Sequence, residues 1–334
     1  MVPVETSFLA GMATVIDTAE ARLPAPRTGR RTTVFVVGLD PEDLTVLNRM
    51  PWALDIRGVL TPAELATDGF GELLAKARKE LDAFEGEIGA ITGYRPYPAS
   101  ALVPVLCAEH GLPSVPLEAV LKCEHRYWSR LEQREVIDEL PDFGAVDLDR
   151  PEPPDGVPFP MFLKSFLPGF SVEVRDEAEF AHAARTFRSE LAGERFGWEG
   201  APIEGAACLA EGALHGVRAS VEGYVHQGNV VVYGALDTVT YPGTRSVLRY
   251  QYPSQLGEDT VRRMEEIAGL VMRRIGFGNG TFGMEFFCDP ASGQVCLLQI
   301  KPTHTPERAE LFECVDGVTN HTIMLRLGLG EDPG

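Results

Sequence analysis

Basic residues are scarce in this sequence relative to acidic ones. Its 334 residues include 30 Lys and Arg against 49 Asp and Glu, which gives a formal net charge of −19. A nucleic acid or an anionic membrane would be repelled by most of such a surface, so neither is expected as a partner. A local cluster of basic groups, or a helix N-terminus, still suffices to bind a phosphorylated ligand.

Long hydrophobic runs and paired cysteines are also missing. No segment has the roughly 18 consecutive apolar residues of a membrane span, and the N-terminus lacks the basic and apolar regions of a secretory signal. The six cysteines are scattered, with no C-x-x-C pair and no histidine at zinc-ligand spacing. We therefore expect a cytoplasmic protein whose cysteines are reduced core residues.

Three common catalytic fingerprints are absent as well. The sequence has no G-x-S-x-G elbow, no Walker phosphate loop and no G-x-G-x-x-G dinucleotide loop. The Gly-rich stretch FGNGTFG at residues 277–283 precedes a predicted strand instead of opening a helix, so we interpret it as a turn. An unrelated α/β hydrolase or transferase is the least favoured hypothesis.

The N-terminal third alternates strands with helices. Continuous apolar runs at residues 32–39 and 87–94 predict buried parallel strands. Helices are predicted over residues 71–86 and over residues 99–116, the latter closed by glycine and proline. This alternation predicts a small doubly wound α/β domain that ends near residue 115.

Two segments of this part have weaker patterns. Residues 1–31 suggest one helix packed loosely on the first domain, and the stretch after residue 39 is interpreted as a polar helix or turn. A longer mixed-charge helix is predicted over residues 117–140. The stretch DLDRPEPPDGVPFP at residues 147–160 is rich in Pro and Asp, which favours a boundary between subdomains.

The rest of the chain has the pattern of a mostly antiparallel α+β half. Its predicted strands and helices follow one another as strand 159–166, a loop and strand over 168–174, helix 177–193, strand 205–214, a β section over 217–239 and helix 258–276. A turn is expected at residues 226–229 inside the β section, and one or two helices are expected in the tail.

A hairpin near the C-terminus carries the main candidate site. Strands 281–288 and 295–300 are joined by a turn with Asp-Pro and Ser-Gly pairs. Alternate residues of a hairpin share a face, so Glu285, Gln299 and Lys301 are expected in one cleft. A carboxylate flanked by polar groups suits a nucleotide-bound Mg²⁺. The alternative is that Glu285 is simply the polar side of a half-buried strand.

The order of several motifs resembles the ATP-grasp superfamily over nearly the whole chain. The stretches that carry the resemblance are CEHRYWSRLEQ, FPMFLKSF, CLAEGALHG and SVEGYV, followed by RYQYPS and VDGVTNH. The last two resemble a carboxylate–amine ligase-like subgroup. The resemblance implies an N-terminal pre-grasp α/β domain (1–115), a central region with a small lid subdomain (116–222) and a large C-terminal domain with the metal hairpin (223–334).

Nucleotide-contacting residues are implied by this resemblance. Lys164 matches the strand lysine that contacts the α- and β-phosphates, and Arg126 stands where a first nucleotide-contacting lysine is usual. Glu211 matches a glutamate that meets the adenine amino group, and the backbone of Gly212 and Leu214 falls at the adenine-binding hinge.

The same resemblance implies further roles around the reacting groups. The metal ligands would be Glu285 and Gln299, and the implied cofactors are ATP and Mg²⁺. Arg249, in RYQYPS, would orient the substrate carboxylate, while Lys301 would contact phosphate or that carboxylate. Ser171 would serve the phosphate loop together with Gly169.

The sequence departs from the family where the chemistry occurs. The hairpin of ATP-grasp ligases usually ends in E-x-N, and here Gln299 and Lys301 replace the Glu and the Asn. An amide in place of a bridging carboxylate weakens Mg²⁺ binding, and a neighbouring ammonium repels the ion. The loop at residues 167–171 is short, and Arg218 occupies a ribose-contacting position that is often acidic.

Two functional hypotheses follow. In the first, the protein is an ATP-dependent ligase that joins a small-molecule carboxylate to an amine through an acyl phosphate, releasing ADP and phosphate. In the second, it is a catalytically degenerate ATP-grasp relative that acts as a scaffold or regulatory partner. A homodimer, or a complex with an active paralogue, is the expected assembly by analogy.

Overall fold

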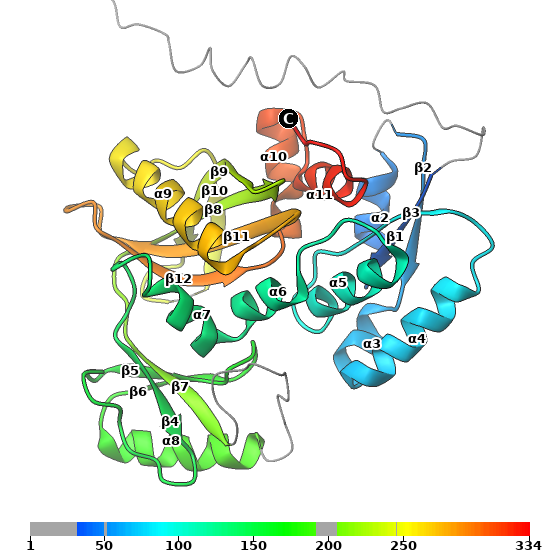
Figure 1. The fold of residues 1–334 in the computed structure, drawn as a ribbon. Coiled ribbons are helices and arrows are strands. Elements are labelled where there is room, and N and C mark those ends of the chain that lie inside the picture. The colour runs from blue at the N-terminus through cyan, green and yellow to red at the C-terminus, as the bar shows by residue number, and fades with distance from the viewer. Residues whose placement is uncertain (1–31, 50–51, 192–205, 245) are drawn as a thin grey trace, which may run out of the picture.

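Three sheets organise the part of the chain that the computed structural model describes, residues 32–49, 52–191, 206–244 and 246–334 (Figure 1). One sheet has three parallel strands in the order β2-β1-β3, and the other two have four and five antiparallel strands. The helix predicted within residues 1–31 lies outside the described residues.

The parallel sheet lies in the N-terminal α/β unit. Its elements are β1 (Thr32–Val37), α2 (Pro41–Asn48), β2 (Leu54–Val59), α3 (Pro62–Thr67), α4 (Phe70–Asp82), β3 (Ile88–Thr92) and α5 (Ala99–His110). Apolar residues of α4 and α5 cover one face of the sheet. The other face packs against α2 and the C-terminal helix α11 (Asn320–Gly328), which Figure 1 shows beside the first strands. Helices on both faces confirm the predicted doubly wound arrangement.

The segment after residue 39 corrects the sequence-based interpretation. It contains two helices and a strand, β2, instead of a polar helix or turn. β2 is an edge strand with Arg57 and Gly58 exposed, and Arg57 pairs with Asp55 across 2.8 Å. An edge strand keeps polar residues on its open side, so it lacks the continuous apolar run by which buried strands are recognised.

The prediction of one helix over residues 117–140 is also wrong, because the structure has two shorter helices there. α6 (Leu117–Glu124) ends at His125, whose side chain then caps α7 (Arg126–Gln133) by accepting a hydrogen bond from the Trp128 amide. The amide of Arg126 donates to the Phe166 carbonyl at 2.7 Å. This bond to a distant loop replaces a helical one, and the break aims α7 at the second sheet.

The four-stranded sheet has the order β4-β7-β5-β6 and is covered by α8. Its elements are β4 (Phe143–Asp147), β5 (Met161–Lys164), β6 (Ser171–Val174), α8 (Glu177–Glu190) and β7 (Ala207–Gly212). The Pro-rich stretch at residues 147–160 joins β4 to β5 within this one sheet. The predicted subdomain boundary is therefore wrong, because the strands before and after this stretch, β4 and β5, belong to the same sheet.

The five-stranded sheet, β10-β9-β8-β11-β12, forms the largest unit. Its elements are β8 (Val217–His226), β9 (Asn229–Thr240), β10 (Val247–Gln251), α9 (Glu258–Ile275), β11 (Gly280–Cys288), β12 (Val295–Lys301) and α10 (Ala309–Asp316). The predicted turn joins β8 to β9 through Gln227 and Gly228, both with positive φ. The expected domain boundary at residue 222 falls inside β8. β10 includes residues 249–251, the start of the segment that was expected to be a loop at residues 249–254.

The sheet has two chemically different faces. Met284 and Phe286 pack with α9 in the main core, as do Ala219 and Val221. The strand alternation turns Glu285 and its β8 partner Ser220 to the opposite face. Helix α9 covers only the apolar face, and Glu285 lies on the opposite, polar face of this sheet.

Among the described residues, none of the helices combines the length and the apolar composition that crossing a lipid bilayer requires. The longest, α9, has 18 residues and carries charged residues at both ends. Its apolar stripe is used to cover the five-stranded sheet.

Candidate active site

A cavity of about 180 Å³ lies where α6 and α7, the four-stranded sheet and β12 meet. It collects five of the residues singled out in the sequence: Arg126, Lys164, Ser171, Glu211 and Gln299. The remaining walls come mainly from Cys123, Glu124, Ser129, Arg130, Gln133, Pro168, Leu298 and Ile300. The cavity encloses less space than the roughly 300–1,000 Å³ of typical small-molecule sites, so it matches only part of a nucleotide.

Glu211, on β7, is the central anion of this cavity. Its side chain is only 3% exposed. The Arg130 Nε donates to Glu211 Oε1 at 2.6 Å, and the Lys164 Nζ donates to Oε2 in a short contact. Both carboxylate oxygens are thus satisfied by cations of the protein itself.

The Arg130 guanidinium connects two sheets. Besides Glu211 on the four-stranded sheet, it donates to the carbonyls of Leu297 and Leu298 on β12, at 2.8 and 2.6 Å. Its Nη1 also donates to Gln133 Oε1 at 2.6 Å. Because the side chain is buried and its donors point in several directions, Arg130 fixes the four-stranded sheet against the hairpin.

The charges of this cluster shift the pKa values of its members. Burial by itself raises the pKa of Glu211, but the neighbouring charges of Arg130 and Lys164 outweigh it and lower the pKa to about 2. Burial lowers the pKa of the Lys164 ammonium, and the charge of Glu211 opposes that shift. The carboxylate therefore stays ionised at neutral pH.

Arg126 lies at the mouth of the β5–β6 turn. Its Nη1 donates to the carbonyls of Ser165 and Phe170, at 3.0 and 3.3 Å. The Phe170 amide donates to Ser165 Oγ at 3.1 Å. One of the few N–H groups of this short loop is therefore used within the turn. Arg126 lines the cavity, and its hydrogen bonds to the two carbonyls hold the turn closed.

A second ion cluster surrounds Glu285 on the polar face of the large sheet. Glu285 pairs in register with Gln299, whose Nε2 donates to Glu285 Oε2 at 3.0 Å. Lys301 Nζ lies 2.7 Å from Oε1, and Arg218 Nη2 donates to Oε2 at 2.9 Å. The expected grouping of Glu285, Gln299 and Lys301 is therefore present, with Arg218 added from β8.

Burial alone raises the pKa of Glu285. The charges of Lys301 and Arg218 oppose that effect and lower the pKa to about 2. The carboxylate is thus a charged member of the cluster.

The donor set around Glu285 does not fit a divalent cation. Both carboxylate oxygens are bound by protein donors, and Gln299 presents its amide nitrogen to them. In the described part of the chain, no three His, Cys, Asp or Glu side chains come together as a metal site. A divalent ion about 4 Å from one ammonium meets repulsion on the order of 8 kcal/mol at an effective dielectric near 20. The implied Mg²⁺ is therefore not supported at Glu285 and Gln299.

Three other predicted site residues lie outside the cavity lining. The Gly212 amide donates to the Asp142 carbonyl at 2.9 Å, which extends the pairing of β7 with β4. Leu214 follows β7 and is half-buried. Arg249 is exposed on the edge strand β10, with its Nη2 3.4 Å from Gln251 Oε1.

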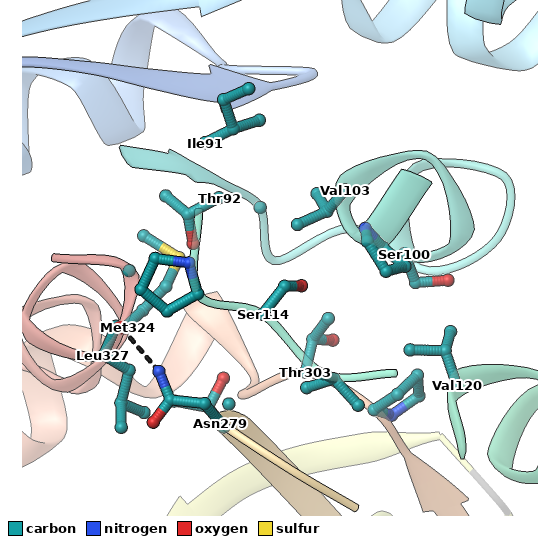
Figure 2. Close-up of a pocket in the computed structure, with 18 residues that line it drawn as sticks. Ile91, Thr92, Ser100, Val103, Ser114, Val120, Asn279, Thr303, Met324 and Leu327 are labelled. Carbon is teal, nitrogen blue, oxygen red and sulfur yellow. Dashed lines mark hydrogen bonds between the residues drawn. The ribbon is translucent and has the colours of Figure 1, made fainter. Parts of the chain in front are cut away.

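A smaller cavity of about 50 Å³ lies between the N-terminal unit and the large sheet (Figure 2). Its 18 lining residues, drawn in Figure 2, include no charged side chain. Asn279 spans one wall by donating to the Leu327 carbonyl at 2.7 Å. The neutral lining and small volume make it an interface gap, and the charged cavity is the candidate active site.

Sequence reasoning missed two charged residues of the charged cavity, Arg130 and Glu124. Arg130 follows Arg126 by one helical turn, and that i, i+4 spacing is a signal that both point to one side. Glu124 is buried beside them, where its carboxylate accepts from Ser100 Oγ at 2.6 Å and from the Tyr97 amide at 3.0 Å. Burial raises the pKa of Glu124, with those hydrogen bonds opposing the shift.

Comparison with known proteins supports the fold. No protein-family model and no curated protein sequence matches this chain. Among solved structures, L-amino acid ligase from Bacillus licheniformis is similar with a TM-score of 0.71 and 16% identity, covering 90% of this chain and 75% of that one.

Two further similar structures are complexes with nucleotides. Biotin carboxylase from Campylobacter jejuni, in a βγ-ATP complex, has a TM-score of 0.64 and 14% identity over 90% of this chain and 71% of that one. An N5-carboxyaminoimidazole synthase from Aspergillus clavatus, bound to ADP and 5-aminoimidazole ribonucleotide, has a TM-score of 0.63 and 15% identity over 91% and 78%. This chain has the ATP-grasp fold, as the order of its sequence motifs predicts.

Proposed function

We propose that this protein binds ATP in the charged cavity and acts as an ATP-dependent carboxylate–amine ligase. The observation that carries the proposal is the convergence of Arg126, Lys164, Ser171, Glu211 and Gln299, from four separate segments of the chain, on one cavity. The ATP-grasp fold adds weight, since the similar L-amino acid ligase and the nucleotide complexes share it.

The proposed reaction has two transfers. A carboxylate oxygen of the first substrate attacks the γ-phosphorus of ATP, the bond to the ADP oxygen breaks, and an acyl phosphate forms. The amine nitrogen of the second substrate then attacks the acyl carbon, phosphate leaves, and the nitrogen loses a proton to give the amide.

Positive charge in the cavity is the main contribution of the protein to this chemistry. The cavity and the adjoining Glu285 cluster together hold five cationic side chains (Arg126, Arg130, Lys164, Arg218 and Lys301) and three carboxylates (Glu124, Glu211 and Glu285). Such an excess attracts polyphosphate and stabilises charge on the transferred phosphoryl group, in a protein that is otherwise strongly acidic.

Individual roles follow from position. Lys164 and Arg126 would hold phosphate oxygens, with Ser171 at the loop. Both oxygens of Glu211 accept from Arg130 and Lys164, so Glu211 would position Lys164 in place of the adenine contact that the resemblance implies. The backbone at Gly212 and Leu214 would face the base. Lys301 would contact the transferred group, and Arg249, on the exposed strand β10, would orient the substrate carboxylate.

The direct test is ADP release by the purified full chain with ATP and mixtures of amino acids. We expect release that needs both a carboxylate and an amine, accompanied by an amide product in mass spectra. Lys164→Met should abolish it, while the exposed Lys79→Met on α4 is the matched control. Absence of nucleotide binding by the unmodified protein would overturn the proposal.

One observation favours a second candidate, a scaffold or regulatory partner that keeps the fold without turnover. It is the capture of both Glu285 oxygens by Lys301 and Arg218. Nucleotide binding without ADP release in any substrate mixture would favour this second function. Sedimentation of the protein alone, and with an active paralogue, would then separate a homodimer from a mixed complex.

A further inference from the structure

The Glu285 cluster carries an inference that rests on the proposed nucleotide site. We propose that Lys301 and Arg218 take the place of a divalent cation, so that this protein binds the phosphate groups of its nucleotide without a metal. The ligand is a free nucleoside triphosphate or diphosphate, and both cations are paired with Glu285 before it binds.

The geometry of the cluster supports this role. Lys301 and Arg218 approach Glu285 from different strands, β12 and β8, and bind different oxygens at 2.7 and 2.9 Å. The register of β11 against both strands sets this arrangement, because Glu285 pairs with Gln299 on one side and Ser220 on the other. The two cations are therefore held beside one carboxylate by the sheet itself.

Both cations keep donors for a ligand. An ammonium has three N–H donors and a guanidinium has five, and the contact of Lys301 or Arg218 with Glu285 uses one of them. Their side chains are 37% and 27% exposed, so they are reachable from solvent. Phosphate oxygens can thus bind to the cations while Glu285 stays paired.

The cluster also adjoins the cavity. Gln299, which donates to Glu285, lines the cavity together with Lys164 and Arg126. Polyphosphate bound to Lys164 would extend towards Lys301 and Arg218, where the fixed charges neutralise it. Fixed cations favour the more highly charged free nucleotide over its metal complex, which is opposite to the preference of a carboxylate-lined site.

Calorimetric titration of the full chain with ATP and with ADP, each in EDTA and in excess MgCl₂, tests this inference. We expect affinity in EDTA at least equal to that in MgCl₂. Binding that is about tenfold or more tighter with Mg²⁺ would overturn the inference and leave the proposed nucleotide site intact. Absence of binding under both conditions would overturn the proposed function and this inference together.

Variants of the hairpin make the test sharper. Gln299→Glu combined with Lys301→Asn should weaken binding in EDTA about tenfold and make Mg²⁺ tighten it, because a carboxylate replaces the amide and a cation is lost. Lys301→Arg should retain the metal-free binding. Lys79→Asn, which removes one positive charge from the exposed end of α4, should leave both affinities unchanged.

Circular dichroism of each variant confirms that it is folded before it is compared. If the folded double variant and the unmodified protein respond to Mg²⁺ in the same way, the assignment of Lys301 as the metal substitute is wrong. If Lys301→Arg weakens binding in EDTA as much as the double variant does, a positive charge at this position is not what the ligand requires.

Discussion

Glu211 and Glu285 are two buried carboxylates that each bind two cations, yet their surroundings differ. The partners of Glu211, Arg130 and Lys164, are 3% and 15% exposed, whereas those of Glu285, Lys301 and Arg218, are 37% and 27% exposed. Arg130 donates its other N–H groups to Gln133 and to two β12 carbonyls, so it serves structure. Lys301 and Arg218 reach solvent and keep donors for a ligand, so the arginines of the two clusters have different functions.

The largest effect is expected from breaking the inner cluster. Arg130→Met should destabilise the protein by about 3–5 kcal/mol, because Glu211 loses a buried partner and two β12 carbonyls lose their donor. Urea denaturation of both proteins measures the difference. A loss below about 1 kcal/mol would mean that the guanidinium does not hold the two sheets together.

Acid should reveal the same cluster. The pKa of Glu211 falls from an ordinary value of 4.5 to about 2 in the folded protein, so the folded state holds fewer protons than the unfolded state between these values. The stability contributed by Glu211 is complete above pH 4.5 and is lost as the pH falls towards 2, by about 3 kcal/mol in total. Denaturation at a series of pH values should show a smaller slope for Glu211→Gln.

The outer cluster should respond differently to the loss of its carboxylate. Glu285→Gln should cost only about 1 kcal/mol, because Lys301 and Arg218 can turn to water. The same substitution should tighten ATP binding in EDTA severalfold, since it removes one negative charge beside the phosphates. Weaker ATP binding by Glu285→Gln in EDTA, measured by calorimetry, would mean that Glu285 is needed to hold Lys301 and Arg218 in place for the phosphates.

The smallest effect is expected at an ion pair on the surface. Arg78 and Glu109 bridge α4 and α5 with side chains 48% and 36% exposed. Arg78→Gln should change the free energy of unfolding by less than about 1 kcal/mol, because solvent screens both charges. Its urea midpoint therefore serves as the baseline against which Arg130→Met is compared.

Local sequence patterns alone determined much of this protein. The apolar run of β1, the Gly-closed helix α5 and the turn-containing hairpin β11–β12 were all predictable, because neighbouring residues set their periodicity and turn chemistry. The order of short motifs along the chain likewise predicted the ATP-grasp fold, and the strand alternation placed Glu285, Gln299 and Lys301 on one face.

Only the tertiary structure decided what those residues contact. Arg218 reaches Glu285 across 67 positions of the sequence, and Arg130 reaches Glu211 across 81. The helix break at His125 likewise depends on a loop that comes about 40 residues later, which supplies the Phe166 carbonyl. Periodicity reports which side of an element is polar, but charge pairing depends on which elements the packing brings together, and that is a property of the whole fold.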